Sequence, residues 1–437
     1  MTARVWASIA VVGLVGNLAW TAESIYLNLF VYDTISDNPQ VIAAMVAASA
    51  TTATVGTVVF GAVSDRLGRR RLFLSGAFVL WGLSTMTFGL VTVDGVAHLV
   101  PVADAVLVTV VAIILLDCVM SLFGAAAFSS TFMAWVTDVT TTGNRGRVEG
   151  LLVTLPPLSI VVAIALLGHF SPRGDWQGLF ALIGLIMVVA GLAAAVLVRD
   201  AASIRPQRDG LVKAITHGLR PSTVRLNPRL YLAILAFAIA GIATSTFMPF
   251  FFIYVQYYLR IEGYTVLFAA ALAAAAAISL LGGRLIDRLG KVAVLLPAAG
   301  VYALGLVLMF FARETVPALL CGVVVLSGFM LVFACCGGLI RDYTPRDRVG
   351  SVQGVRTILS TLPPALIGPF IGAAVITGAD EYYIEFGVEK LVPTPTIFLA
   401  AACALVLIVI PAILLRRAGT SALGSEPDPT PTPGLRG

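Results

Sequence analysis

Twelve long apolar segments constrain this chain more than any other feature of its sequence. Of its 437 residues, 59% are apolar and 12% are charged, whereas soluble domains have about 45–50% and about 25%. This composition excludes an ordinary soluble enzyme, and the unbroken apolar runs argue against a β-barrel, whose strands alternate apolar and polar residues. A helix crosses a bilayer with about 20 mainly apolar residues. We therefore predict an all-α integral membrane protein with twelve spans: Val5–Tyr32, Val41–Val63, Leu72–Val93, Ala105–Val136, Val148–Phe170, Gly178–Val198, Leu230–Leu259, Tyr264–Leu285, Val292–Ala312, Val316–Ile340, Val352–Thr377 and Thr396–Leu415.

Lysines and arginines gather in alternate loops of the chain. The loops after the even-numbered segments hold most of them, while the opposite loops hold mainly Asp and Glu. Because basic loops stay in the cytoplasm, we expect a multi-pass protein of the cell membrane with both termini cytoplasmic. The first apolar run is too long for a cleavable signal peptide and lacks its small-residue cleavage pattern.

The basic central loop divides the chain into regions. We expect an N-terminal six-helix bundle (1–198), a cytoplasmic loop (199–229), a C-terminal six-helix bundle (230–415) and a disordered cytoplasmic tail (416–437). Within the loop, the apolar residues from Leu211 to Leu219 are spaced for a helix on the membrane surface, and a solvated linker is an equal alternative. The prolines from Pro427 to Pro433 are typical of disorder.

A short motif occurs twice, at equivalent places in the two bundles. The loop after the second segment contains Gly-x-x-x-Asp-Arg-Leu-Gly from Gly61 to Gly68, followed by Arg69 and Arg70. The loop after the eighth segment contains the same pattern from Gly283 to Gly290, followed by Lys291. Asp138 precedes a glycine by eight residues after the fourth segment, as Asp342 does after the tenth. Two copies of a six-helix unit are typical of a transporter built from parallel repeats.

On these motifs the chain resembles the major facilitator superfamily, over essentially Val5 to Leu415. The resemblance implies two six-helix halves that rock about a central substrate, with the repeated loops latching one side. It also implies the gating residues, which are Gly61, Asp65, Arg66, Gly68, Arg69, Arg70, Asp287, Arg288, Gly290 and Lys291, together with Asp138, Arg145 and Asp342. Independently, a glycine lets helices approach closely, and Asp65 suits the N-terminal dipole of the helix after Gly350. The alternative is that these arginines only fix the topology.

A carboxylate in the first segment is the clearest candidate for substrate or proton binding. Charged side chains inside a span are costly and functional by default, and Glu23 lies in an otherwise apolar helix. An acid among aromatic rings suits a sugar, and the same acid could carry a coupling proton. The alternative is a residue near the outer helix end that reaches water. Helical spacing puts these residues near one face, with Tyr26 beside it: Gly16, Trp20, Glu23, Leu27 and Phe30.

Two further spans carry ionisable candidates. Asp117 lies within the fourth segment, yet 21 residues before Asp138, which is roughly 31 Å of helix. A coupling carboxylate and an outer-rim residue are equally supported. The eleventh segment has a polar stripe that should face a cavity or a partner, and we favour pairing of its arginine with Glu149 or Asp65 at the inner gate over substrate contact. The stripe consists of Gln353, Arg356, Thr357 and Ser360.

Aromatic side chains in the seventh segment are a weaker candidate. Phe247, Phe251, Tyr254 and Tyr258 share a face, and Pro249 should loosen the helix by removing a hydrogen bond. Interrupted helices often border a transporter's binding site, although such a stripe is as often packing. Tyr254 and Tyr258 are therefore substrate candidates.

Some short segments are similar to the glycoside-pentoside-hexuronide type of sugar symporter. They are Asn17–Glu23, Asn28–Tyr32, Ala134–Asp138 and Asn144–Gly146. Sodium-coupled members of that group carry acids in the second helix, and Val41–Val63 has none, so a proton is the preferred coupling ion.

The leading hypothesis is a secondary active transporter, proton-coupled, for a small polar solute such as a sugar or glycoside. The alternative is proton-driven efflux of a drug or another amphipathic compound, since one acid among aromatic rings can hold a lipophilic cation. A non-transporting scaffold is less favoured because both motif copies keep their Asp, Arg and Gly. No nucleophile, metal-ligand or phosphate-loop pattern occurs, so we expect no enzyme activity, cofactor, metal or nucleic acid. We expect a monomer.

Overall fold

The computed structural model describes residues 2–67, 69–99, 104–140, 144–200, 224, 227–261, 264–344, 349–385 and 388–423. Within these ranges, the side chains at 62, 65–67, 99, 145, 146, 149, 265, 280, 349–355, 357, 384, 385, 388 and 418–423 are not described. The predicted surface helix between Leu211 and Leu219 lies outside the described residues.

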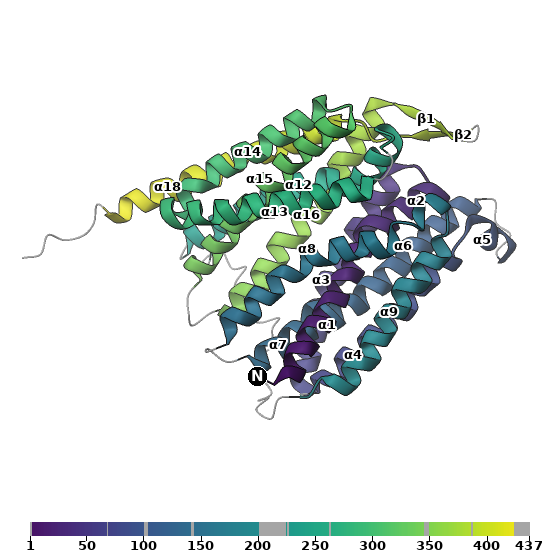
Figure 1. The fold of residues 1–437 in the computed structure, drawn as a ribbon, viewed down its shortest axis with the longest axis horizontal. Helices are drawn as coiled ribbons and strands as arrows, with labels where there is room; N and C mark the ends of the chain where they lie inside the picture. Colours follow the sequence, from purple (N-terminus) through teal and green to yellow (C-terminus); the bar gives the residue numbers. More distant parts are fainter. Residues whose placement is uncertain are drawn as a thin grey trace, which may run out of the picture.

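Among its described residues, the N-terminal half contains six helices long and apolar enough to span a membrane, four of which run over more than one labelled element. Figure 1 shows them as a purple-to-teal bundle. The elements are α1 (Ala3–Ala22), η1 (Glu23–Leu27), α2 (Asn28–Thr34), α3 (Pro39–Leu67), α4 (Arg70–Thr87), η2 (Phe88–Leu90), α5 (Val93–Leu99), α6 (Ala105–Gly124), η3 (Ala125–Phe132), α7 (Met133–Val139), α8 (Arg145–Leu167), η4 (Ser171–Arg173) and α9 (Trp176–Leu197).

The C-terminal half supplies six more such helices, green to yellow in Figure 1. Its elements are α12 (Pro228–Ile253), η5 (Tyr254–Tyr258), α13 (Tyr264–Leu289), α14 (Lys291–Phe311), α15 (Thr315–Tyr343), α16 (Val349–Ala379), β1 (Tyr382–Glu385), β2 (Val388–Leu391), α17 (Thr396–Val406) and α18 (Val409–Leu423). The predicted twelve-helix fold is confirmed. The last helix continues to Leu423, beyond the expected boundary at Leu415, and residues 424–437 lie outside the described residues.

Glycines let the helices of each half pack closely. A Cβ on Gly82 of α4 would lie 2.5 Å from the carbonyl oxygen of Gly184 in α9, and one on Gly328 of α15 would lie 2.5 Å from the backbone of Tyr302 in α14. Apolar residues instead cover the outside of the bundle, for example Phe311, which is 68% exposed. Small residues between helices and apolar residues facing outward are the pattern expected where lipid replaces water.

Three of the spans contain a π-helical turn, in which the hydrogen bonds skip one more residue than in an α-helix. These turns are η1 in the first span, η3 in the fourth and η5 in the seventh. Such turns are rare and frequently lie at functional sites. Pro249 lies inside regular α12, and the irregular turn begins five residues later, at Tyr254.

The two ends of the molecule differ in structure. At one end, here called the hairpin end, the antiparallel strands β1 and β2 pair Tyr382 with Leu391 and Glu385 with Val388. At the other, the arginine-rich end, lie Arg70 at the start of α4 and Arg416 in α18. In Figure 1 the hairpin lies close to α2, whereas α18 and the start of α4 lie far apart at the opposite end. Between the ends, α3 packs against α16 and α8 against α13.

Candidate functional site

Two acidic residues meet inside the N-terminal half. Asp117 of α6 is 1% exposed, and Glu23 of η1 is half-buried with its Oε2 atom fully buried. The two carboxylates are close enough for their negative charges to repel each other. Ser121, one turn after Asp117, donates a hydrogen bond to Oε1 of Glu23 at 3.3 Å, and Ser49 of α3 lies beside Asp117. Asp117 therefore lies inside the bundle rather than at its outer rim.

The acid pair has more buried oxygen atoms than hydrogen-bond donors. Glu23 Oε2 and Asp117 Oδ1 have no hydrogen-bond partner among the described residues. Burying two neighbouring charges is costly, and two carboxylates that share a site do not both ionise readily. A hydrogen-bond donor from a ligand or a bound proton would satisfy these two oxygens.

Two tryptophan rings pack together about one turn before Glu23. Trp20 packs against Trp81 of α4 with ring centroids 5.3 Å apart. Gly124 of α6 makes room for both rings, because a Cβ there would lie 2.8 Å from Trp81 and 3.1 Å from Trp20. The Nε1 atom of Trp20 is buried without a partner among the described residues. Tyr26 is buried at 1% exposure, so its ring belongs to the packed interior.

The predicted single face of the first span is divided by η1. Trp20 and Glu23 face α4 and α6, whereas Phe30 packs on Trp176 and Phe180 of α9 at 5.6 and 5.2 Å between ring centroids. The residues of the expected single face thus contact different helices, and the π-helical turn lies between Trp20 and Phe30.

A large apolar cavity lies elsewhere, between α8 of the first half and α12, α13 and α15 of the second. Its volume is about 1020 Å³, and none of the described residues that line it is charged. Phe251, Phe268, Phe329 and Phe333 contribute aromatic surface. This volume is at the upper end of the range for small-molecule sites, about 300–1000 Å³.

Only part of the predicted aromatic stripe of the seventh span reaches this cavity. Phe247 and Phe251 line it. Tyr254 is fully buried and packs on Phe398 at 5.1 Å between ring centroids, and Tyr258 stacks on Tyr254 at 5.3 Å. Neither tyrosine is among the lining residues, so the structure does not bring these two candidates to the cavity.

The polar stripe of the eleventh span is divided in a similar way. Arg356 is half-buried, and its guanidinium carbon lies 5.7 Å from the ring centroid of Phe237. Ser360 donates to the carbonyl oxygen of Arg356 at 2.6 Å, so its hydroxyl is satisfied within the helix. The side chains of Gln353 and Thr357, and those of the expected partners Glu149 and Asp65, lie outside the described residues.

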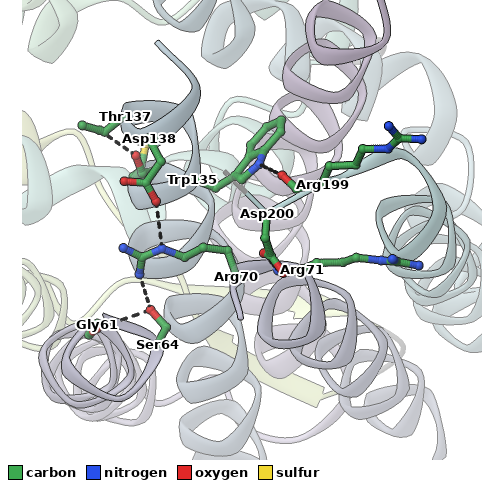
Figure 2. Close-up of polar contacts among 10 residues, drawn as sticks. Gly61, Ser64, Arg70, Arg71, Trp135, Thr137, Asp138, Arg199 and Asp200 are labelled. Atoms are coloured by element: carbon green, nitrogen blue, oxygen red, sulfur yellow. Dashed lines mark hydrogen bonds and ion pairs between the residues drawn. The ribbon is translucent and has the colours of Figure 1, made fainter. Parts of the chain in front are cut away.

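At the arginine-rich end, the first motif copy ties three spans together (Figure 2). Arg70 is only 5% exposed. Its Nε donates to Asp138 of α7 at 3.1 Å, and one terminal nitrogen donates to Ser64 of α3 at 2.6 Å. A Cβ on Gly61 would lie 3.3 Å from Ser130, so this glycine brings α3 close to η3. Arg70 and Asp138, both named as gating residues from the resemblance, thus meet within one half.

Neighbouring contacts at this end were not predicted from the sequence. The backbone N–H of Arg71 donates to Asp200 at 2.8 Å, and the Trp135 indole donates to the carbonyl oxygen of Arg199 at 3.0 Å (Figure 2). They attach the end of the sixth span to the third and fourth. Trp135 lies three residues before Asp138, but Asp200 is far from either motif in the sequence. The motif spacing therefore gave no signal for these contacts.

The second motif copy repeats the ion pair in exposed form. Lys291 lies 2.5 Å from Asp342, and these side chains are 32% and 49% exposed. Lys291 follows the motif glycine directly, whereas Arg70 stands one residue further on. Gly290 has φ +86°, a conformation that favours glycine. Asp287 and Arg288 are exposed, as is Arg69.

Other predicted gating residues cannot be placed. The side chains of Asp65, Arg66 and Arg145 and the whole of Gly68 lie outside the described residues. The expected contact of Asp65 with the helix after Gly350 therefore stays a prediction.

At the hairpin end, hydrogen bonds join the two halves. Tyr257 of η5 donates to Asp33 of α2 at 2.5 Å, and Lys390 of β2 donates to the carbonyl oxygen of Asp33 at 3.2 Å. The N–H of Leu391 donates to Asp37 at 2.7 Å. Sequence reasoning identified these only as loop charges. The one available signal was Lys390, a rare cation among acidic loops.

Comparisons with known proteins agree with this fold. The family model of the Major Facilitator Superfamily matches residues 9–278 and 261–435. A variant of the nucleoside transporter NupG is similar in structure with a TM-score of 0.72 at 11% identity, over 94% of this chain and 99% of that one. A bacterial homologue of the human lysosomal transporter Spinster, inward-facing and occupied, gives 0.67 at 15% identity, over 98% of both chains. No curated protein matches.

Proposed function

Because this chain belongs to the major facilitator superfamily and is a membrane transporter, we propose that it carries an amphipathic, largely apolar solute, coupled to a proton held by Glu23 and Asp117. The observation that carries the proposal is the apolar cavity of about 1020 Å³ between the halves. The protein acts by moving its solute, and no chemical conversion is part of the proposal.

Several hydroxyl groups at the cavity wall already have hydrogen-bond partners. Thr244 and Tyr302 bond each other at 2.8 Å, and Thr154 donates to the carbonyl oxygen of Leu151 at 2.7 Å. A sugar hydroxyl beside these groups would lose water and gain few partners, and an unpaired buried hydroxyl costs about 1–3 kcal/mol in proteins. An apolar solute gains free energy in the same place, about 25 cal/mol per Å² of buried surface.

The acid pair supports proton coupling because neither acid lines the apolar cavity, so a proton and a solute could bind at separate sites. Glu23 of η1 and Asp117 of α6 lie where these two elements meet in the N-terminal half. A proton bound there removes like-charge repulsion, which changes how tightly η1 and α6 pack. Coupling between two sites requires such a difference between states.

Sugar uptake is the second candidate. Trp20 Nε1 and Glu23 Oε2, both without partners among the described residues, favour it. The Trp20 indole could donate a hydrogen bond to a hydroxylated solute, and the Glu23 carboxylate could accept one from it. Against it, the ring of Trp20 already packs on Trp81.

For orientation, we infer that the arginine-rich end faces the cytoplasm of a cell membrane. Arg69, Arg70, Arg416 and Arg417 lie there, and basic loops are retained on that side. The hairpin end then faces outward.

The test is transport by purified protein in liposomes with an internal pH-sensitive dye. A proton flux driven by amphipathic probes such as dodecanoate or dodecyltrimethylammonium, lost in Glu23→Gln and Asp117→Asn but kept in the exposed control Glu314→Gln, supports the proposal. A flux driven by sugars and not by either probe overturns it in favour of the sugar candidate.

A further inference from the structure

One end of the apolar cavity lies beside a half-buried arginine. Phe333 lines the cavity and meets Phe237 edge-to-face at 4.6 Å between ring centroids. The guanidinium of Arg356 lies over the other ring, with its carbon 5.7 Å from the centroid of Phe237. A continuous aromatic wall therefore leads from the cavity to this cation.

The backbone of α15 brings the guanidinium still closer. Ala334 lines the cavity and is followed by Gly337 three residues later, a rise of about 4.5 Å along the helix. A terminal nitrogen of Arg356 lies 4.0 Å from the position that a Cβ on Gly337 would occupy. The cation is thus about one helical turn beyond the apolar wall.

A second arginine stands at the same place. Arg341 follows Gly337 by one turn, is exposed, and is close enough to Arg356 for their charges to repel. Among the described residues, neither has a carboxylate within ion-pair distance. In this respect Arg356 and Arg341 differ from the cations of the two motif copies, because Arg70 pairs with Asp138 and Lys291 pairs with Asp342.

We propose that this site takes a single-chain amphipathic anion as the transported solute. The apolar tail lies in the cavity, and a carboxylate, phosphate or sulfate head lies between Arg356 and Arg341. Guanidinium groups bind such heads with paired hydrogen bonds, and an anion here would offset the repulsion between the two cations. The proposal rests on the proposed function and adds the charge of the solute to it.

The tail and head can be tested by separate variants. Gly322 lines the cavity, and a Cβ there meets nothing within 4 Å, so Gly322→Leu fills space without a clash. Gly300→Leu is the matched control, because Gly300 is exposed on α14 with equally open space. Arg356→Gln removes the head contact, Arg356→Lys keeps the charge, and Arg341→Gln changes the exposed partner.

The measurement is equilibrium binding of dodecanoate and of dodecyltrimethylammonium to each variant in lipid nanodiscs. We expect Arg356→Gln to weaken dodecanoate binding about ten-fold or more, Arg341→Gln to weaken it less and Arg356→Lys to restore part of it, with the cationic probe unchanged or tighter. We expect Gly322→Leu to weaken both probes and Gly300→Leu neither.

The outcomes separate this inference from the proposed function. Equal binding of dodecanoate to wild type and to both arginine variants, with Gly322→Leu still defective, overturns the anionic head and leaves the amphipathic transporter. No defect in Gly322→Leu overturns the cavity as the site and both proposals with it. Loss of dodecanoate binding when neutral discs are replaced by discs of anionic phospholipid assigns the site to a bilayer lipid and overturns the solute proposal.

Discussion

Replacing Tyr257 by Phe removes one hydroxyl from the hairpin end and leaves the ring in place. That hydroxyl donates to the Asp33 carboxylate at 2.5 Å across the two halves. A hydrogen bond to a charged group contributes about 1.5–3 kcal/mol. If the bond exists only while this end is closed, its loss should raise the open population roughly 10- to 150-fold. The Tyr257–Tyr32 ring contact at 5.2 Å remains in the variant.

Spin-label distances across the hairpin end measure this change. Labels at Gln40→Cys and Glu389→Cys, both exposed, report the separation of α3 and β2, once the exposed Cys403 is replaced. We expect Tyr257→Phe to increase the long-distance population. Tyr382→Phe is the control, because that tyrosine is 53% exposed. Identical distance distributions for the two variants would refute the view that the Tyr257–Asp33 bond holds this end closed.

Three further predictions concern stability, measured by the unfolding of detergent-solubilised protein. Arg70→Ala should cost about 3–5 kcal/mol, since it leaves a partly buried carboxylate unpaired, whereas Lys291→Ala in the exposed copy should cost about 0–1 kcal/mol; equal losses would contradict this. Gly328→Leu should destabilise by about 1–3 kcal/mol or more through overpacking against α14, and a stable variant would show that the helices separate easily. Gly290→Ala should cost about 1–3 kcal/mol because of its positive φ, and no change would mean that the turn relaxes freely.

The spans and the two loop motifs were predictable because each depends on residues close together in the sequence. Apolar run length determines a span, and the repeat of Asp, Arg and Gly identifies equivalent loops. The contact between Arg70 and Asp138 was not predicted, because it joins two different helices. The side chain of Asp65, on which the expected latch depends, lies outside the described residues.

The hairpin end was not predictable, because its contacts join residues more than 200 positions apart, and those between Asp37 and Leu391 are 354 apart. The depth of Asp117 was also undetermined by its own helix. The run from Ala105 to Val139 has 35 residues, longer than a bilayer needs, and only the neighbouring Glu23 of another helix fixes where the acid lies.

The π-helical turns have a consequence for comparing this chain with its relatives. Each turn holds one residue more than an α-helical turn, so it amounts to a one-residue insertion in the middle of a span. A relative without that residue would keep both helix ends in place and rotate one part by about 100° against the other. Equivalent residues on the two sides of η1, η3 or η5 then align only if a single gap is allowed inside a membrane helix, a place where alignments normally forbid one.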